Sequence, residues 1–380
     1  MKLEQIATLL NNTLVPNYLG TETTISEDLS NVVELGTAIA NLDGEEVKNF
    51  AGDFIVGVAR NVMDTRQYRR ETYGLMNDAR EYGGVIQRVK SKLLSASDSP
   101  IWTLESGQDY FDGTYYGIET DVKIYSKDTA FQVKNSIPTE MYKQYFTSAD
   151  GVREFVAMIE STVDNTITLE LNSLAKTTLQ QLIATIDEDR SISLLTLYNT
   201  NAGLTGGDAL TADEALFNAP FLRWSAEMII RLRDLTQDFN KKYNDGTVPT
   251  FTPAEDLRVT LLSEFARAIE FNMEADTFHR DLVSVGEYNT INFWQNASDS
   301  LLPTLGTTAE VVTHVGEGES VTVSNVVGLI YDRYTAGLTA RLDKITAQYI
   351  ANGDYTTYFH HVANSRFIDT RNTAIALKLV

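Results

Sequence analysis

The chain has 380 residues, which is long enough for two domains or for one domain with large insertions. Hydrophobic residues make up 43% of it, which is sufficient for a real core. It contains no cysteine, which excludes disulfides, thiolate metal sites and cysteine nucleophiles. A formal net charge of -21 makes the chain a poor general binder of nucleic acids. The N-terminus has one lysine and no long apolar run, so we expect neither a signal peptide nor a membrane span.

The charge is unevenly distributed along the chain. Between Arg60 and Lys92 there are eight basic and four acidic residues, so this segment is positive and the remainder strongly negative. A basic segment on an acidic body predicts a partner with an acidic surface, which can be another copy of the chain. The arginines that we expect to contact a neighbouring subunit are Arg66, Arg69, Arg70, Arg80 and Arg88.

The first 117 residues divide into two parts. Residues 1–60 carry three short amphipathic stripes separated by glycine and proline, which predict either an arm that packs on something else or a small helical domain. Residues 60–117 read as a long excursion, in which 85–92 alternates like a strand and 109–117 is rich in turn formers and aromatic residues. The strand-like return favours a two-stranded extension over a disordered insertion.

A single long helix is predicted from Val152 to Asp187, after a helix-start signal at residues 147–150. Apolar residues recur there at steps of three or four, and a rise of 1.5 Å per residue gives a length of roughly 50 Å. The middle is rich in β-branched residues, so packing along the apolar face must hold the helix. We expect Asp164 to be exposed on the opposite face. The predicted core face consists of Phe155, Ile159, Val163, Ile167, Leu171 and Leu174.

Two interpretations of this helix are open: a coiled-coil arm or bundle member, or a spine on which strands and a second domain are mounted. On the second interpretation its partners are two strands of one sheet at residues 118–136 and a strand at 373–380. A short helix at 138–146 would lead into the spine. The other elements expected after the spine are a capping box at 211–214, a helix from about Phe221 to a turn at 244–246, a strand at 258–262 with a short helix behind it, a hairpin at 311–323, a core strand at 326–331, and strands at 342–349 and 355–362.

A search for catalytic or ligand-binding motifs finds none. Phosphate loops, dinucleotide-binding glycine motifs and nucleophile elbows are absent from the sequence. His360 and His361 are adjacent, so in a strand they would face opposite sides and make a poor metal pair. We therefore expect no catalytic residue, no metal site and no cofactor; the chain offers surfaces instead of a site.

Three stretches carry a resemblance to a known family: 253–265 as a strand followed by a helix, 328–338 as a strand and acidic turn, and 374–379 as a closing strand. With the order of elements, they make the chain similar to the major capsid proteins of tailed double-stranded DNA phages. The resemblance implies an α+β, Hong Kong 97-type capsid fold. Its parts would be an N-terminal arm at 1–60, an extended β-hairpin loop at 60–117, a peripheral domain with the spine helix at 118–187 and 339–380, and an axial domain at 188–338.

The same resemblance implies a function. The chain would self-assemble into hexamers and pentamers of an icosahedral or prolate shell around phage double-stranded DNA, without sequence-specific DNA binding. Portal and scaffolding proteins would be its further partners, the virion its location and the host cytoplasm its place of assembly. The alternatives are an encapsulin-type compartment shell, a virion adaptor or portal-associated protein, and an enzyme with its site in residues 188–338.

Overall fold

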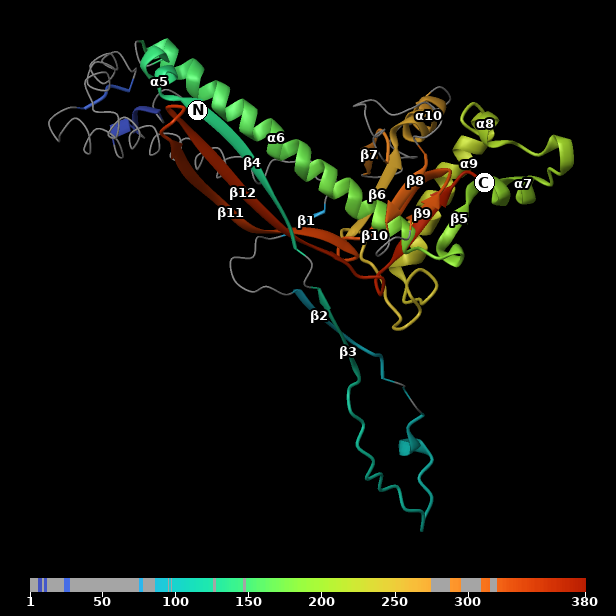
Figure 1. The fold of residues 1–380 in the computed structure, drawn as a ribbon. Helices are drawn as coiled ribbons and strands as arrows, with labels where there is room; N and C mark the ends of the chain where they lie inside the picture. The colour runs from blue at the N-terminus through green and yellow to red at the C-terminus, as the bar shows by residue number, and fades with distance from the viewer. Residues whose placement is uncertain are drawn as a thin grey trace.

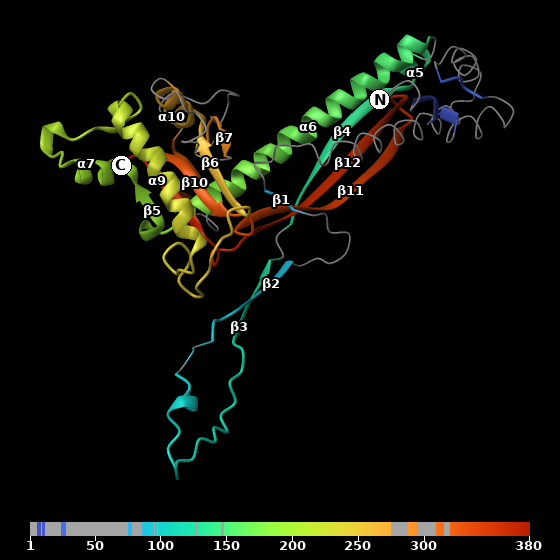
Figure 2. The ribbon, with the colours of Figure 1, turned by 180° about the vertical axis from the view of Figure 1, so that it is seen from behind.

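The computed structural model describes residues 6–8, 10–11, 24–27, 75–77, 86–94, 96, 98–125, 128–145, 148–274, 288–294, 309–314 and 320–380. One long helix, α6 (Ala149–Ala184), links two groups of strands. A four-stranded sheet runs beside its N-terminal half, and a five-stranded sheet with several helices gathers around its C-terminal end (Figure 1). A thin two-stranded hairpin leaves the molecule between the two sheets, as the view from behind also shows (Figure 2).

Helix α6 confirms the predicted long helix, although both of its ends lie about three residues earlier than expected. It begins after Ser148, whose hydroxyl accepts a hydrogen bond from the backbone N–H of Gly151 at 3.1 Å. In the β-branched middle, the Thr166 hydroxyl donates to the carbonyl of Thr162 at 2.8 Å, so it stays compatible with the helix. The short helix before it, α5 (Thr139–Tyr145), also lies where the sequence predicts it.

The four-stranded sheet packs against the N-terminal half of α6. Its order is β1 (Met76–Asn77), β11 (Ala336–Ile350), β12 (Tyr355–Ile368) and β4 (Asp128–Pro138), with β12 antiparallel to both neighbours. Alternate residues of β4, β11 and β12 point at the helix and meet its apolar stripe. The cluster contains Val133, Ile137, Ile345, Tyr358 and Val362 from the strands and Ile159, Val163, Ile167 and Leu171 from the helix.

The five-stranded sheet forms the second core. Its order is β5 (Ser191–Ser193), β13 (Ala374–Lys378), β10 (Val326–Asp332), β6 (Leu257–Leu262) and β7 (Asn289–Ile291). Every residue of the central strand β10 is buried. Gly328 is required there, because a Cβ atom would lie 2.7 Å from a methyl carbon of Leu261 and 3.1 Å from one of Leu377.

Helices and a second hairpin surround this core. They are α7 (Leu194–Ala202), α8 (Ala212–Ala215), α9 (Ala219–Gln237), α10 (Ser263–Glu274), and the antiparallel pair β8 (Val311–His314) and β9 (Ser320–Val323). The capping box at Thr211 and Glu214 is confirmed. The predicted end of the next helix, at a turn beginning at Asn244, was wrong, because α9 ends at Gln237. No helix in the described ranges is long and apolar enough to cross a lipid bilayer.

The prediction that residues 118–136 form two strands of one sheet was wrong. The first strand, β3 (Thr120–Tyr125), pairs with β2 (Ile86–Ser91) in the projecting hairpin, whereas β4 pairs with β12. Both strands alternate with period two, and that period does not say which other strand is the partner. The middle of α6 therefore packs on β4, β11 and β12 without β3.

The C-terminal strand was also assigned to the wrong sheet. Residues 373–380 were expected beside the spine in the peripheral part, but β13 lies between β10 and β5. Its residues belong to the second core, with Ile375 and Leu377 fully buried. A continuous apolar run is typical of a strand covered on both faces, which explains its place inside the five-stranded sheet. The division into domains otherwise stays a prediction.

The expectation that Asp164 is exposed was wrong as well, since the residue is only 4% exposed. Helix α6 is covered on more than the side that faces the sheet. Ile6 and Ile25, far away in the sequence, join the same apolar cluster. Positions beside the stripe are therefore buried too, which a single helical face does not reveal.

His360 lowers the stability of the core between α6 and the four-stranded sheet at acidic pH. It is fully buried in β12 between Val133 and Ile345, and neither ring nitrogen has a hydrogen-bond partner among the described residues. Burial lowers the pKa of His360 to about 4. Because the folded-state pKa lies below the unfolded value, the unfolded chain binds the proton first, and this residue reduces stability as pH falls from about 6.5 to about 4.

We expect His360→Leu to abolish this contribution to the pH dependence. Relative to the variant, the unchanged chain should lose about 2 kcal/mol of unfolding free energy between pH 7 and pH 5. Urea unfolding of both proteins at the two pH values measures the difference. His361→Gln is the control, because the His361 ring is partly exposed and bonds Thr346 on the other side of the strand. If the difference in unfolding free energy between wild type and His360→Leu is the same at pH 7 and pH 5, the prediction is contradicted.

Candidate assembly surface

The hairpin of β2 and β3 projects from the molecule and belongs to neither the four-stranded nor the five-stranded sheet. Its strands pair from Ile86 opposite Tyr125 to Ser91 opposite Thr120, and the chain between them extends far from the body (Figures 1 and 2). An extension of this length buries little apolar surface of its own. It is therefore a candidate for contacts with another molecule.

The two faces of this hairpin have unexpected chemistry. The face toward the body carries charged side chains, and the face toward solvent carries apolar ones. Val89, Val122 and Ile124 are 56%, 44% and 65% exposed, whereas Arg88, Lys90, Asp121 and Lys123 are half-buried. The exposed apolar side chains are thus available to a partner.

A buried ion pair fixes the root of the hairpin. Arg371 is fully buried, and its Nε and Nη2 donate to the two carboxylate oxygens of Asp369, each at 2.8 Å. These hydrogen bonds raise the pKa of Arg371. Burial by itself would raise the pKa of Asp369, but the hydrogen bonds and charge of Arg371 hold that pKa below its usual value.

The same arginine also reaches both strands of the hairpin. Its Nη1 donates to the backbone oxygen of Asp121 at 2.9 Å and to the Asp121 carboxylate at 3.1 Å. Its Nη2 donates to the backbone oxygen of Arg88 at 3.3 Å. We call Arg371, Asp369, Asp121 and the backbone of Arg88 the root node.

Basic side chains of the hairpin complete the anchorage. Lys90 Nζ donates to the backbone oxygen of Arg371 at 2.9 Å, and Lys123 Nζ lies 3.3 Å from the Asp245 carboxylate. The Arg88 guanidinium lies 4.1 Å from the ring centre of Phe367 and donates to the backbone oxygen of Tyr334 at 3.0 Å. Burial lowers the pKa of both Arg88 and Lys90. These cations therefore bind their own chain.

The far end of the hairpin has the opposite character. Between Leu93 and Ile118 there is no lysine or arginine, and the charged residues are Asp98, Glu105, Asp109 and Asp112. The side chains of Trp102, Phe111 and Tyr115 are 92%, 86% and 92% exposed. Local hydrogen bonds shape the loop, such as Phe111 N to the Asp109 carboxylate at 3.0 Å. This acidic and aromatic segment, which we call the tip, is an exposed apolar surface of the kind that marks contact sites.

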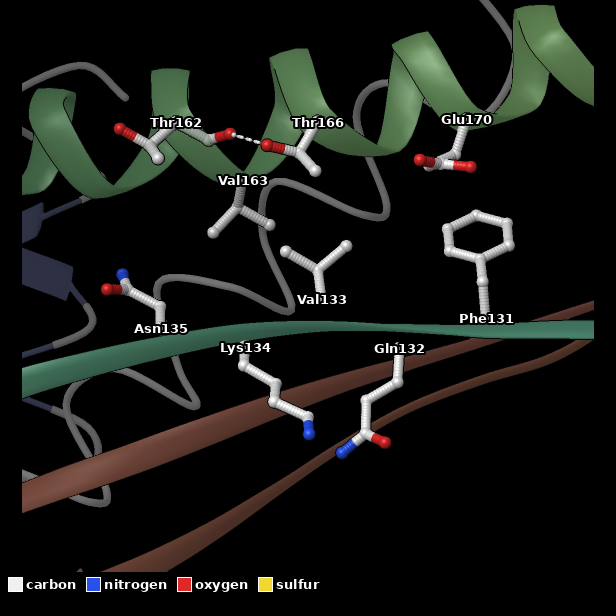
Figure 3. Close-up of a pocket in the computed structure, with 9 residues that line it drawn as sticks. All are labelled: Phe131, Gln132, Val133, Lys134, Asn135, Thr162, Val163, Thr166 and Glu170. Atoms are coloured by element: carbon white, nitrogen blue, oxygen red, sulfur yellow. Dashed lines mark hydrogen bonds between the residues drawn. The ribbon is translucent and has the colours of Figure 1, made fainter. Parts of the chain in front are cut away.

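The side of the four-stranded sheet away from α6 carries chemistry that complements the tip. On the side away from α6, two cross-strand rows run through Lys134, Phe359 and Thr346 and through Gln132, His361 and Lys344. Figure 3 shows Gln132 and Lys134 pointing away from α6, while Val133 points toward the helix. The rings of Phe359 and His361 stack at 6.3 Å. Neither row contains a carboxylate, so we call these six residues the basic open face.

The opposite side of β4 forms a groove with α6. It has a volume of about 490 Å³ and is lined by apolar residues such as Val133 and Val163, by Thr162 and Thr166, and by Glu170 near one end (Figure 3). The described residues contain no group of histidine, aspartate or glutamate side chains that could hold a metal ion.

Comparison with known proteins identifies what these surfaces belong to. A family model of Phi29-like phage major capsid proteins matches residues 10–377. The chain belongs to this family. No curated protein matches it. Its expected function as a phage major capsid protein is confirmed, and the same match makes the capsid protein a component of the virion that assembles with other capsid subunits.

Solved structures confirm the fold. A chain in the capsid structure of Staphylococcus phage Andhra matches the capsid protein with a TM-score of 0.53 and 10% identity, over 83% of this chain and 84% of that one. A chain in the structure of the head fiber and inner core protein of native bacteriophage P68 gives a TM-score of 0.51 and 11% identity, over 80% and 83%. The capsid protein has the Hong Kong 97-type capsid fold, as the resemblance implied.

The residues singled out in the sequence fall in three places. Phe155, Ile159, Val163, Ile167 and Leu171 are buried against the four-stranded sheet, while Leu174 is half-buried and packs on the second core. Arg88 lies at the hairpin root with its guanidinium turned to its own chain. The positions Arg66, Arg69, Arg70 and Arg80 lie outside the described residues.

The root node was missed by the sequence analysis. Its two halves, Asp121 and Arg371, are 250 residues apart. The one signal was the alternation of charged residues at 119, 121 and 123. Alternation shows that a strand has two faces, but it does not show that the charged face is the inner one.

Proposed function

We propose that the capsid protein closes into hexamers and pentamers of an icosahedral or prolate shell around phage double-stranded DNA, with the β2–β3 hairpin as the lateral connector. The observation that carries the proposal is the exposed tip, with large aromatic side chains held away from their own core. Contacts between unlike surfaces of identical chains close into rings when the rotation allows it. A tip that docks on a different surface of the next copy is such a contact.

The receiving surface that best fits the tip is the basic open face. The tip carries four carboxylates and no basic residue, and the open face carries Lys134, Lys344 and His361 without a carboxylate in its rows. Phe359 offers an aromatic contact to the aromatic side chains of the tip. Complementary charge would guide the encounter and the register, and apolar burial would supply most of the affinity.

Other parts of the proposal rest on the family and on charge. Arg66, Arg69, Arg70 and Arg80 would contact acidic surface of a neighbouring copy. The net charge of -21 would limit sticking to the packaged DNA, so DNA would be held without sequence-specific contacts. A portal and a scaffolding protein would be further partners, with assembly in the host cytoplasm. We propose a purely structural role without enzymatic activity; DNA in purified particles, instead of a protein cargo, would separate a capsid from an encapsulin-type compartment.

Replacing three tip aromatics tests the connector. We expect a variant with Trp102→Ser, Phe111→Ser and Tyr115→Ser to keep its melting temperature, because these side chains contribute little to the core of their own chain, and to lose particle formation. Negative-stain microscopy and sedimentation measure the yield of particles. Phe217→Ser is the matched control, since Phe217 is also 86% exposed but lies outside the hairpin. Normal particles from the triple variant would refute the connector role.

Charge exchange tests the receiving surface separately. Single exposed ion pairs contribute only about 0–1 kcal/mol, so two positions are changed together. We expect Lys134→Glu with Lys344→Glu to lower the particle yield, and Asp98→Lys with Glu105→Lys in the same chain to restore it, since both of these tip carboxylates are exposed. Failure of the restoration, with both double variants folded, would move the docking site away from the basic open face and leave the connector role intact.

A further inference from the structure

The hairpin is bonded at its root to the connection between β12 and β13, which passes from one sheet to the other. This connection is tied to the neighbouring turn after β10. Asp369 N donates to the carbonyl of Thr335 at 2.6 Å, and Asn372 Nδ2 donates to that of Tyr334 at 2.9 Å. A group anchored here is held by both sheets at once.

Arg371 sits in this connection and uses all five of its N–H groups. Two of them go to Asp369, and this bidentate pair alone would neutralise the guanidinium. The other three go to the hairpin: two to Asp121 on β3 and one to Arg88 on β2. Because a guanidinium is planar with donors in fixed directions, contacts to two strands constrain an orientation as well as a distance.

From this geometry we propose that Arg371 is a positioning residue, which sets the direction of the hairpin relative to the two sheets before copies of the chain meet. The connector then docks already oriented, and less conformational entropy is lost on assembly. The consequence for assembly rests on the proposed function. The orientation itself is a property of the single subunit and can be measured without assembly.

The competing explanation is that the Asp369–Arg371 ion pair only stabilises the fold and does not orient the hairpin. A substitution at Asp121 distinguishes the two explanations. Its side chain is 36% exposed, so Asp121→Asn leaves the buried Asp369–Arg371 pair in place and weakens only the contact to the hairpin. The matched control is Glu119→Gln, at the residue directly before the same strand. Glu119 pairs with Lys92 across the hairpin at 2.6 Å and makes no part of the root node.

The absence of cysteine makes distance measurements simple. Spin labels at Ser91→Cys on the hairpin and Ser173→Cys on α6 report the direction of the hairpin by pulsed electron resonance, in full-length chain diluted with unlabelled chain. A second pair, at Ser173→Cys and Gln348→Cys on β11, reports the body. All three positions are surface-exposed.

We expect a narrow hairpin-to-body distance distribution in the unchanged node. Asp121→Asn should broaden it roughly twofold, and Arg371→Met with Asp369→Asn should broaden it further. The α6-to-β11 distribution should keep its width in these variants, and Glu119→Gln should leave the hairpin-to-body distribution as wide as in wild type. Equal widths in Asp121→Asn and wild type would overturn the proposal, and this holds even if the double variant does not fold. A loosened hairpin with normal particle yield would instead contradict the benefit of a fixed orientation for assembly and leave the positioning role standing.

Discussion

Ile167→Asp in the middle of α6 is expected to lower the free energy of unfolding by about 3–5 kcal/mol, because it buries a charge without a partner. Ile167 is 4% exposed and belongs to the cluster that joins α6 to β4, β11 and β12. The helix around it is rich in β-branched residues, so tertiary packing must supply the stability that local propensity does not. Loss of that packing should also lower the particle yield.

The same substitution two residues away is the control. Leu169 is 59% exposed on the same helix, so Leu169→Asp should change stability by about 0.5 kcal/mol or less. Asp164 is unsuitable for this purpose, since it is itself buried. Thermal unfolding of the two variants, followed by particle yield, measures both effects. Equal losses from Ile167→Asp and Leu169→Asp would mean that packing on the sheet does not hold α6.

Features with a strong local period were predictable from the sequence. Helix α6 follows from a 36-residue stretch whose apolar residues keep helical spacing behind a serine cap. Strands β10, β11 and β12 follow from their apolar or alternating runs, and the hairpin β8–β9 from its spacing. These elements gave the order that resembles a phage capsid protein, and through it the family and the fold.

Pairing between distant segments was beyond sequence reasoning. Period two identified β3 and β4 as strands, yet nothing local distinguishes a strand of the projecting hairpin from a strand of the four-stranded sheet. Strand β13 was placed beside the spine because of its position in the chain, whereas its partners are β10 and β5. The root node depends on such pairing, which explains why its members passed unnoticed.

The expected contacts of the basic segment with a neighbouring subunit stay a prediction, and the structure describes only Arg88 among its named arginines. A basic segment around the hairpin was expected to face an acidic neighbour. Within the described part of that segment, Arg88 and Lys90 bind the body of their own chain, and the projecting tip is acidic. Net charge over a window does not distinguish cations that anchor a strand from cations that meet a partner. The aromatic tip is therefore a second candidate contact surface, beside the arginines that lie outside the described residues.

Asp369→Ala is expected to cost about 3–5 kcal/mol, because it removes the bidentate carboxylate of the buried Arg371 guanidinium and leaves only the partly exposed Asp121 carboxylate beside it. Arg371 is 0% and Asp369 1% exposed at the side chain, so water cannot replace the lost partner. Adding Arg371→Met removes the stranded charge, and the double variant should regain a large part of the loss. Glu119→Ala, which breaks an exposed pair with Lys92, should change stability far less, because water screens that pair.

The pH dependence gives this prediction a second readout. The pKa of Asp369 in the folded chain is below its unfolded value, so its contribution is present above the unfolded pKa and is lost only as pH falls through the folded pKa. The cost of Asp369→Ala should therefore be the same at pH 7 and pH 5.5, a range over which His360 already reduces stability. Urea unfolding of the single variant, the double variant and wild type at both pH values measures this. Losses that simply add in the double variant would show that the two buried side chains are not coupled, and the root node would then not hold the hairpin through its charges.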